Sequence, residues 1–123
     1  MRRKPFFLLL SLGAALISGE AFAGDGRIKS ADVTALLVDD TDFGGCMAEL
    51  SPGPETILGD CDADWVTFDC LGGFPESTKA NASQKFSQAQ LALVMSNKVR
   101  VYITNDRIVN GFCFGTRIDI IAE

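Results

Sequence analysis

The chemistry available to this chain is limited first by its lack of histidine, because none of the 123 residues is of that type. A Ser-His-Asp triad therefore cannot form, and none of the four cysteines has an imidazole that could activate it as a nucleophile. Acidic residues are numerous, but no two of them stand in a context that raises a carboxyl pKa for acid–base catalysis of the glycosidase type. We therefore expect a protein that is not an enzyme.

A metal centre is also poorly supported. Zinc would need histidine or a CxxC spacing, and the sequence contains neither. Asp60, Asp62 and Asp64 alternate like the first half of a calcium loop, but no glycine follows Asp64 and the twelfth position is Leu71 instead of an acidic residue. We expect a solvated loop here, and neither a metal ion nor a cofactor.

Candidate ligand-binding residues lie in two predicted loops, one near residue 41 and one near residue 108. They are Asp40, Thr41, Phe43, Asn105, Asp106 and Asn110. Their hydroxyl, amide and carboxylate groups can bond to sugar hydroxyls, and Phe43 offers an apolar ring face. The alternative interpretation is that turn geometry alone selects aspartate, asparagine and glycine at these positions.

The first 23 residues have the pattern of a secretory signal peptide. A basic head at Arg2–Lys4 precedes an apolar run from Phe6 to Ile17, and Ala21–Ala23 gives the small-x-small pattern of a cleavage site. The mature protein would then be residues 24–123, secreted or periplasmic. No other stretch is apolar enough to insert into a membrane.

The mature chain is expected to be strongly acidic. It keeps 8 basic and 15 acidic residues, for a net charge of −7. This charge repels phosphate backbones and anionic lipid headgroups. We therefore expect that the protein binds neither nucleic acid nor a membrane surface.

All four cysteines lie in the mature chain, and an exported protein is expected to join them in two disulfides. The segments 46–51 and 65–70 both alternate between apolar and polar residues. An antiparallel pairing that sets Cys46 opposite Cys70, and Ala48 opposite Phe68, places the apolar residues of both strands on one side. This register predicts the disulfide Cys46–Cys70.

The second disulfide, Cys61–Cys113, follows by elimination among the three possible connectivities. Each bridge would close a loop of tens of residues and stabilise the fold by roughly 3–4 kcal/mol. In a domain of this size, such a contribution decides stability.

The remaining pattern predicts five strands and one helix. The expected strands are 27–38, 46–51, 65–70, 99–104 and 112–121. Between the third and fourth strands, apolar residues at helical spacing predict a helix capped by Ser77 or Asn81 and ending near Asn97, with Lys85 on its solvent side. The apolar stripe consists of Ala82, Phe86, Ala89 and Leu93. Whether Gly115 forms a bulge that turns Cys113 inward is left open by the pattern.

Three strands, a helix and two strands in 100 residues are typical of an OB-fold-like barrel. The expected fold is mostly β with one helix: a small five-stranded barrel, stabilised by disulfides, in a single domain over residues 24–123. A small sandwich with an appended helix is the alternative. In an OB barrel the loops between strands one and two and between strands four and five flank the ligand face, which selects the two loops named above.

A resemblance supports this fold. The segment SQKFSQAQLALVMSNKVRVYI, a helix rich in Gln and Ala that leads into a strand, resembles the corresponding region of the OB-fold B subunits of subtilase cytotoxin and typhoid toxin. The spacing Cys61-x-x-x-Trp65 and the final Gly-Phe-Cys113 strand also resemble small exported proteins of unassigned function that look like these subunits. The cysteine spacing differs from the toxin pattern. The resemblance implies a binding module that recognises glycans on a host surface and can assemble as a homo-oligomer, in this case a pentamer.

Two functional hypotheses follow. The first is a non-enzymatic, toxin-B-subunit-like module that binds a glycan. The second is a small acidic protein that binds another protein in the periplasm or the medium, for example an inhibitor of a basic hydrolase such as lysozyme. The charge of −7 would steer that association.

Overall fold

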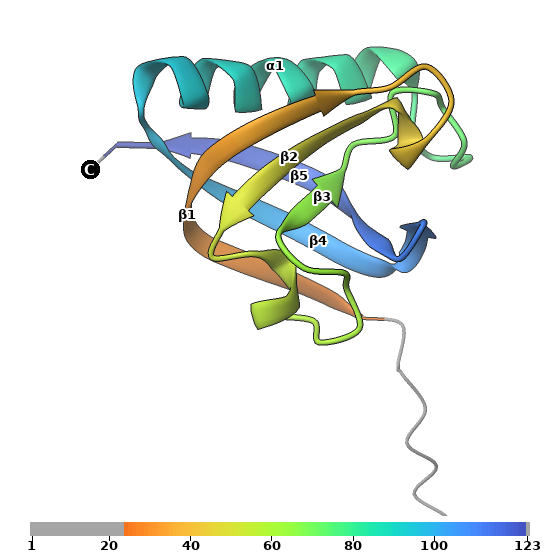
Figure 1. Cartoon of the computed structure of the whole chain (residues 1–123), viewed down its shortest axis with the longest axis horizontal. Helices are drawn as coiled ribbons and strands as arrows, with labels where there is room; N and C mark the ends of the chain where they lie inside the picture. Colours follow the sequence, from red (N-terminus) through yellow and green to blue (C-terminus); the bar gives the residue numbers. More distant parts are fainter. Residues whose placement is uncertain (1–23, 123) are drawn as a thin grey trace, which may run out of the picture.

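The computed structural model describes residues 24–122, so the predicted signal peptide lies outside the described residues. Within this range the strands and the α-helix follow one another in the predicted order (Figure 1). They are β1 (Asp25–Val38), β2 (Cys46–Ser51), β3 (Trp65–Thr67), α1 (Lys79–Met95), β4 (Lys98–Val109) and β5 (Phe112–Ile121), with short 3-10 turns η1 (Phe43–Gly45) and η2 (Pro54–Thr56). In this part of the chain no helix is long and apolar enough to cross a membrane.

The strands form a closed barrel in the order β1-β2-β3-β5-β4. The long β1 makes this possible, because its first half pairs with β4 and its second half pairs with β2. The parallel contact between β3 and β5, at Thr67 and Phe114, closes the ring. The predicted five-stranded, OB-fold-like barrel with one helix is therefore confirmed.

Helix α1 lies across one end of the barrel (Figure 1) and packs mainly against β1 and β5. It buries Ala82, Phe86 and Ala89 of the predicted stripe, and its C-terminal half adds Ala92. The small side chains let the helix approach the strands closely, and Phe86 fills the space between them.

The helix begins at a cap that differs from both predictions. Thr78, between Ser77 and the first helical turn, is the N-cap, and its hydroxyl accepts a hydrogen bond from the N–H of Asn81 at 3.1 Å. Ser96 ends the helix in the left-handed conformation at φ 55°, one residue before the predicted end at Asn97.

Both predicted disulfides are present, but the predicted register between β2 and β3 is wrong by two residues. Ala48 pairs with Val66 and not with Phe68. A shift of two residues keeps every side chain on its face, so Phe68 is still fully buried. Beyond Thr67 the chain leaves the ladder through Asp69 at φ 59°, and this bend brings Cys70 to Cys46 with a Cα–Cα distance of 5.5 Å.

The second disulfide, Cys61–Cys113, ties the loop before β3 to β5. Cys113 is fully buried because β5 contains a bulge: Tyr102 pairs with Arg117 and Ile103 with Gly115, which leaves Thr116 as the extra residue. Of the two arrangements that the sequence left open for β5, the bulged one is therefore correct.

The predicted loop over residues 105–111 is wrong. Strand β4 continues to Val109, and only Asn110 and Gly111 form the turn, at φ 53° and 85°. Positive φ at both central residues is the geometry that an Asn-Gly pair favours in a tight hairpin. Between Thr104 and Ile108, however, β4 carries residues 105–107 with no partners in β5, so this segment bulges from the sheet.

Candidate functional site

The first predicted loop, between β1 and β2, is fixed by its own backbone. The Asp39 carboxylate accepts hydrogen bonds from the N–H groups of Thr41 at 2.9 Å and Asp42 at 2.7 Å. These bonds hold the pKa of Asp39 below its ordinary value. Asp40 and Thr41 are exposed at the tip of the loop.

Phe43 connects this loop to the β4–β5 hairpin. Its half-buried ring makes an edge contact with Phe112, at a centroid distance of 6.0 Å. Phe112 directly follows the turn that contains the exposed Asn110. The structure thus brings the first predicted loop close to the second turn, as the fold prediction required.

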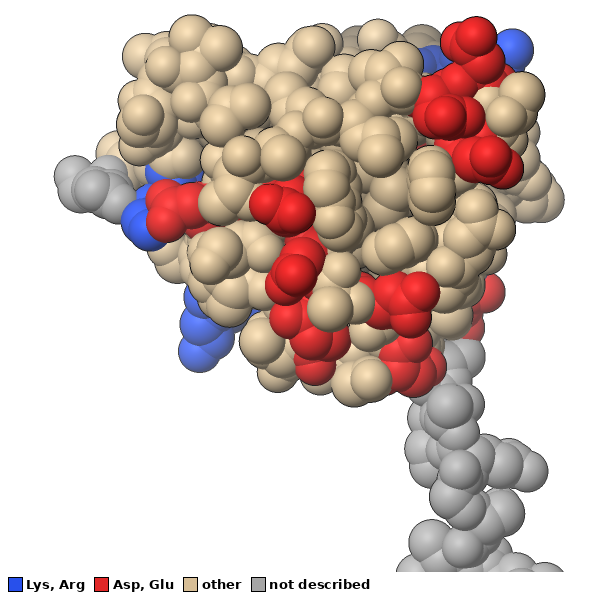
Figure 2. All heavy atoms as spheres, viewed as in Figure 1, with Lys and Arg blue, Asp and Glu red and all other residues tan. Residues whose placement is uncertain are grey.

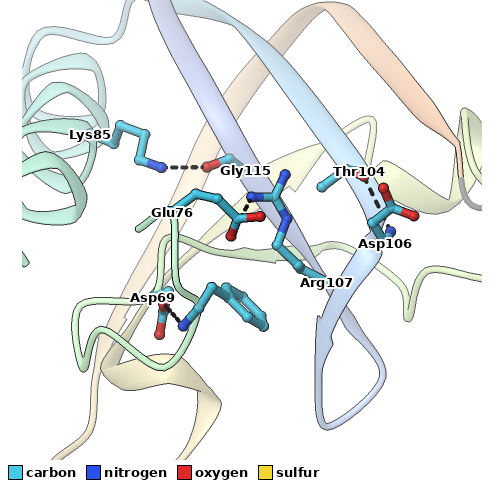
Figure 3. Close-up of polar contacts among 8 residues, drawn as sticks. Asp69, Glu76, Lys85, Thr104, Asp106, Arg107 and Gly115 are labelled. Atoms are coloured by element: carbon cyan, nitrogen blue, oxygen red, sulfur yellow. Dashed lines mark hydrogen bonds and ion pairs between the residues drawn. The ribbon is translucent and has the colours of Figure 1, made fainter. Parts of the chain in front are cut away.

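Asn105 and Asp106 do not join that group in a loop, because they belong to the bulged part of β4. Asn105 accepts a hydrogen bond from the Gly24 N–H and donates to the Asp60 carboxylate at 3.0 Å, so it fixes the start of β1. Asp106 is exposed, and its backbone N–H donates to the Thr104 hydroxyl (Figure 3).

The alternating aspartates of the β2–β3 connection are exposed in the described structure. They are Asp60, Asp62 and Asp64. Among residues 24–122 there is no group of three His, Cys, Asp or Glu side chains that could hold a metal ion.

A cleft that the sequence did not predict lies between the N-terminal turns of α1 and strands β4 and β5. Its volume is about 520 Å³. It is lined by Glu76, Ser77, Asn81, Gln84, Lys85, Arg107, Phe114, Thr116, Arg117 and Ile118. The cleft therefore combines hydroxyl and amide groups with three cations of an otherwise acidic protein.

Lys85 occupies the wall of the cleft, so its predicted place on the solvent side of the helix is wrong. Its Nζ donates a hydrogen bond to the Gly115 carbonyl at 2.8 Å (Figure 3). The same Nζ lies 4.2 Å from the centroid of the Phe114 ring. Burial, helped by the nearby charge of Arg107 and partly offset by that of Asp69, lowers the pKa of Lys85 from its ordinary 10.5 to about 8. The reason for its position is that α1 crosses the rim of the barrel, where its flank meets β5.

Arg107 reaches the same cleft from the β4 bulge. Its Nη1 forms an ion pair with the Glu76 carboxylate at 3.2 Å (Figure 3). Its guanidinium carbon lies 5.0 Å from the centroid of the Phe114 ring. Phe114 thus contacts two cations, Lys85 and Arg107, which its electron-rich ring face attracts. The bulge is what aims Arg107 at the cleft, because a regular strand would offer no extra residues there.

Ser77 supplies an unsatisfied polar group. The residue is 9% exposed, and its hydroxyl has no hydrogen-bond partner in the described structure. It stands just before the N-cap of α1, and the first turn of that helix contains no acidic residue. The positive end of the helix dipole is therefore not compensated within the helix, and it favours an electronegative group nearby.

The sequence did contain a signal for this cleft. Residues 79–121 carry six basic and two acidic side chains, whereas residues 25–67 carry two basic and ten acidic ones. The net charge of residues 24–123, which is −7, conceals this separation. A cationic site on the helix and the last two strands could have been inferred from it.

Comparisons with protein-family models, with curated proteins and with solved structures give no match to this chain. The resemblance to toxin B subunits therefore stays a prediction. Any assignment of function has to come from the geometry of the barrel and its cleft.

Proposed function

We propose that this protein is an exported, non-enzymatic binding module that holds a glycan-type ligand in the cleft between α1 and strands β4 and β5. The observation that carries the proposal is the convergence of hydroxyl and amide side chains on one open cavity of about 520 Å³. These side chains belong to Ser77, Asn81, Gln84 and Thr116. Such groups exchange hydrogen bonds readily with sugar hydroxyls, and the volume is in the range of ordinary ligand sites.

Two further features support a role outside the cytoplasm. The signal-peptide pattern of residues 1–23 predicts export, and both disulfides, Cys46–Cys70 and Cys61–Cys113, are of the kind that persists in oxidising compartments. A barrel cross-linked by two disulfides keeps the walls of the cleft in fixed positions, which lowers the entropic cost of binding.

A glycan array with the purified mature protein tests the proposal. Gln84→Ala removes an amide from the cleft, and Gln90→Ala is the matched control, because Gln90 is also an exposed glutamine of α1 but does not line the cleft. We expect the binding of the best array ligand to fall about tenfold for Gln84→Ala, corresponding to one good hydrogen bond, and to stay unchanged for the control. Equal binding by both variants would place the ligand elsewhere.

The loop residues remain the alternative location for the ligand. Phe43→Ala and Asn110→Ala alter the predicted surface without touching the cleft. If these variants lose binding while Gln84→Ala retains it, the ligand face is the one expected from OB barrels in general and the cleft proposal is wrong.

Assembly is tested separately by the native mass of the mature protein. A pentamer would support the toxin-B-like form of the proposal. A monomer would exclude that form, and it would leave a single-site binding module to be judged by the array.

A second candidate function is inhibition of a basic hydrolase, which the charge distribution favours. In the view of Figure 2, acidic side chains gather in several groups and few basic ones are present. A complex with a basic enzyme such as lysozyme should then form at low ionic strength and weaken steeply with added salt, because the attraction acts between exposed charges. Unchanged hydrolase activity at low salt and an excess of this protein would reject the candidate.

A further inference from the structure

The cleft contains a buried hydrogen-bonding group that the protein itself does not use. Ser77 is a nine-tenths buried residue of the cleft lining, and no described residue accepts a hydrogen bond from its hydroxyl or donates one to it. Burying such a group without a partner costs about 1–3 kcal/mol. A ligand atom in the cleft could supply the partner that the chain lacks.

Two cations that line the same cleft, Lys85 and Arg107, also have unused hydrogen-bond donors. Of the three N–H groups of the Lys85 ammonium, one is used by the Gly115 carbonyl, which is the only described hydrogen-bond acceptor for this group. The Arg107 guanidinium has five N–H donors, and its only described polar partner is the Glu76 carboxylate. The unused donors belong to positively charged groups, so a ligand that accepts hydrogen bonds from them is favoured if it is an anion.

The carboxylates near the cleft do not already fill this role. Asp69 is buried, and each of its two oxygens accepts a backbone hydrogen bond, from the N–H of Gly73 at 2.9 Å and of Phe74 at 2.8 Å, so it acts on Lys85 through its charge and not through a described hydrogen bond. Glu76 does pair with Arg107, but its side chain is 66% exposed. An exposed carboxylate is held weakly and can be displaced.

Arg117, the third cation of the cleft, shares the carboxylate of Asp119 with Arg100, which pairs with it at 3.6 Å. The Arg117 Nε donates to the same carboxylate at 2.8 Å, and the Arg117 side chain is 62% exposed. Lys85 and Arg107 are matched in charge by Glu76 and the buried Asp69. The excess positive charge at the cleft therefore comes from Arg117, which shares its one carboxylate with Arg100. The N-terminus of α1, whose first turn contains no acidic residue, lies beside it.

From these contacts we infer that the inner cleft is an oxyanion subsite in which Ser77, Lys85 and Arg107 bind a carboxylate, sulfate or phosphate group of the ligand. The inference rests on the proposed function, because it names the ligand chemistry of the same cleft. The Ser77 hydroxyl and the Lys85 ammonium donate hydrogen bonds to the oxyanion, and the oxyanion displaces Glu76 from Arg107.

The test is a titration of the mature protein with sodium sulfate, phosphate or acetate, at constant ionic strength set with sodium chloride, followed by NMR chemical shifts or calorimetry. We expect saturable binding, and the relative affinities of the three salts identify the type of oxyanion. Ser77→Ala should weaken binding about tenfold while leaving the fold intact, because the hydroxyl makes no internal hydrogen bond. Lys85→Gln should weaken it at least as much, whereas Lys79→Gln, which removes an exposed cation of the same helix outside the cleft, should have no effect.

Glu76→Gln is expected to change the anion affinity in the opposite direction. It therefore distinguishes an effect on the site from a loss of the fold. Removal of the competing carboxylate should tighten anion binding, by up to about fivefold for an exposed pair. The inference is overturned if none of the three salts binds saturably, or if Ser77→Ala and Lys85→Gln bind as tightly as Lys79→Gln.

The same data separate this inference from the proposed function. Array binding of neutral glycans that depends on Gln84 but not on Ser77 or Lys85 would retain the binding module and reject the oxyanion subsite. Anion binding that depends on Ser77 and Lys85, with no glycan bound on the array, would retain the subsite and reject the glycan proposal.

Discussion

The half-buried Lys85 makes the stability of the protein depend on pH in a direction that is unusual for an acidic chain. Burial lowers the pKa of Lys85 to about 8 in the folded state, against 10.5 for an ordinary lysine. Between these two values the unfolded chain binds more protons than the folded one, so the free energy of unfolding rises with pH. The penalty for the buried charge is fully present below pH 8 and is relieved above it.

The magnitude follows from the two pKa values. Proton linkage gives a gain of about 2 kcal/mol in the free energy of unfolding between pH 7 and about pH 9.5. Lys85 is only about half buried, so water screens part of the effect and about 1 kcal/mol remains. Lys85→Met keeps most of the side-chain volume and abolishes this gain.

Urea unfolding at the two pH values measures the effect, with the fluorescence of Trp65, the single tryptophan, as the signal. The quantity to compare is the change in unfolding free energy between the two pH values, for the wild type and for Lys85→Met. All other groups titrate in both proteins and cancel in the difference, and the lost hydrogen bond to Gly115 adds an offset that is the same at both pH values. Lys79→Met serves as the control, because it removes an exposed lysine from the same helix. If the wild type and Lys85→Met change in parallel with pH, the cleft does not desolvate the ammonium group as argued here.

Three further predictions concern the scaffold. Replacing both Cys61 and Cys113 by alanine should lower the unfolding free energy by about 4 kcal/mol, because this bridge spans 52 residues. Replacing Cys46 and Cys70 should lower it by about 3.5 kcal/mol, because that bridge spans 24 residues. Denaturation midpoints measure the two losses, and non-reducing peptide maps check the connectivity. Thr78→Ala removes the N-cap hydrogen bond to Asn81 and should lower the unfolding free energy by about 1 kcal/mol, whereas Ser77→Ala should not lower it; the reverse ranking would assign the cap to Ser77. Gly111→Ala places a Cβ at φ 85° and against the Asp62 carboxylate, so thermal unfolding should show a loss of about 1–2 kcal/mol, and an unchanged midpoint would contradict the observed hairpin turn.

The alternation of apolar residues was sufficient to predict the barrel and both disulfides, yet it could not determine the strand register. A period of two identifies the face on which a side chain lies, and a shift by two residues leaves every face unchanged. The pairing of Ala48 with Val66 instead of Phe68 depends on where β3 ends. That end is set by the left-handed Asp69, whose carboxylate accepts two hydrogen bonds from the following backbone, and this contact leaves no periodic trace in the sequence.

The β4 bulge was missed for a related reason. Asn105, Asp106 and Arg107 have the composition of a turn, and turn chemistry correctly predicts that the ladder is interrupted there. It does not predict that pairing resumes at Ile108 and Val109 to form a longer hairpin. The candidate site was therefore assigned to exposed loop tips, whereas the bulge turns Arg107 toward the helix and uses Asn105 to hold the N-terminal strand.

The position of Lys85 shows what the helical pattern could have revealed. Lys85 follows Ala82 by three residues and precedes Ala89 by four, which is the spacing of the buried stripe itself, and α1 contains no acidic residue that could pair with it. A lone cation at the edge of an apolar stripe costs stability, as does the unpartnered hydroxyl of Ser77. Natural sequences depart from local consistency mainly where a function requires it. Two such departures lie on one cleft, and a bound oxyanion would offset both of them. A ligand site is therefore a simpler explanation than two independent defects of packing.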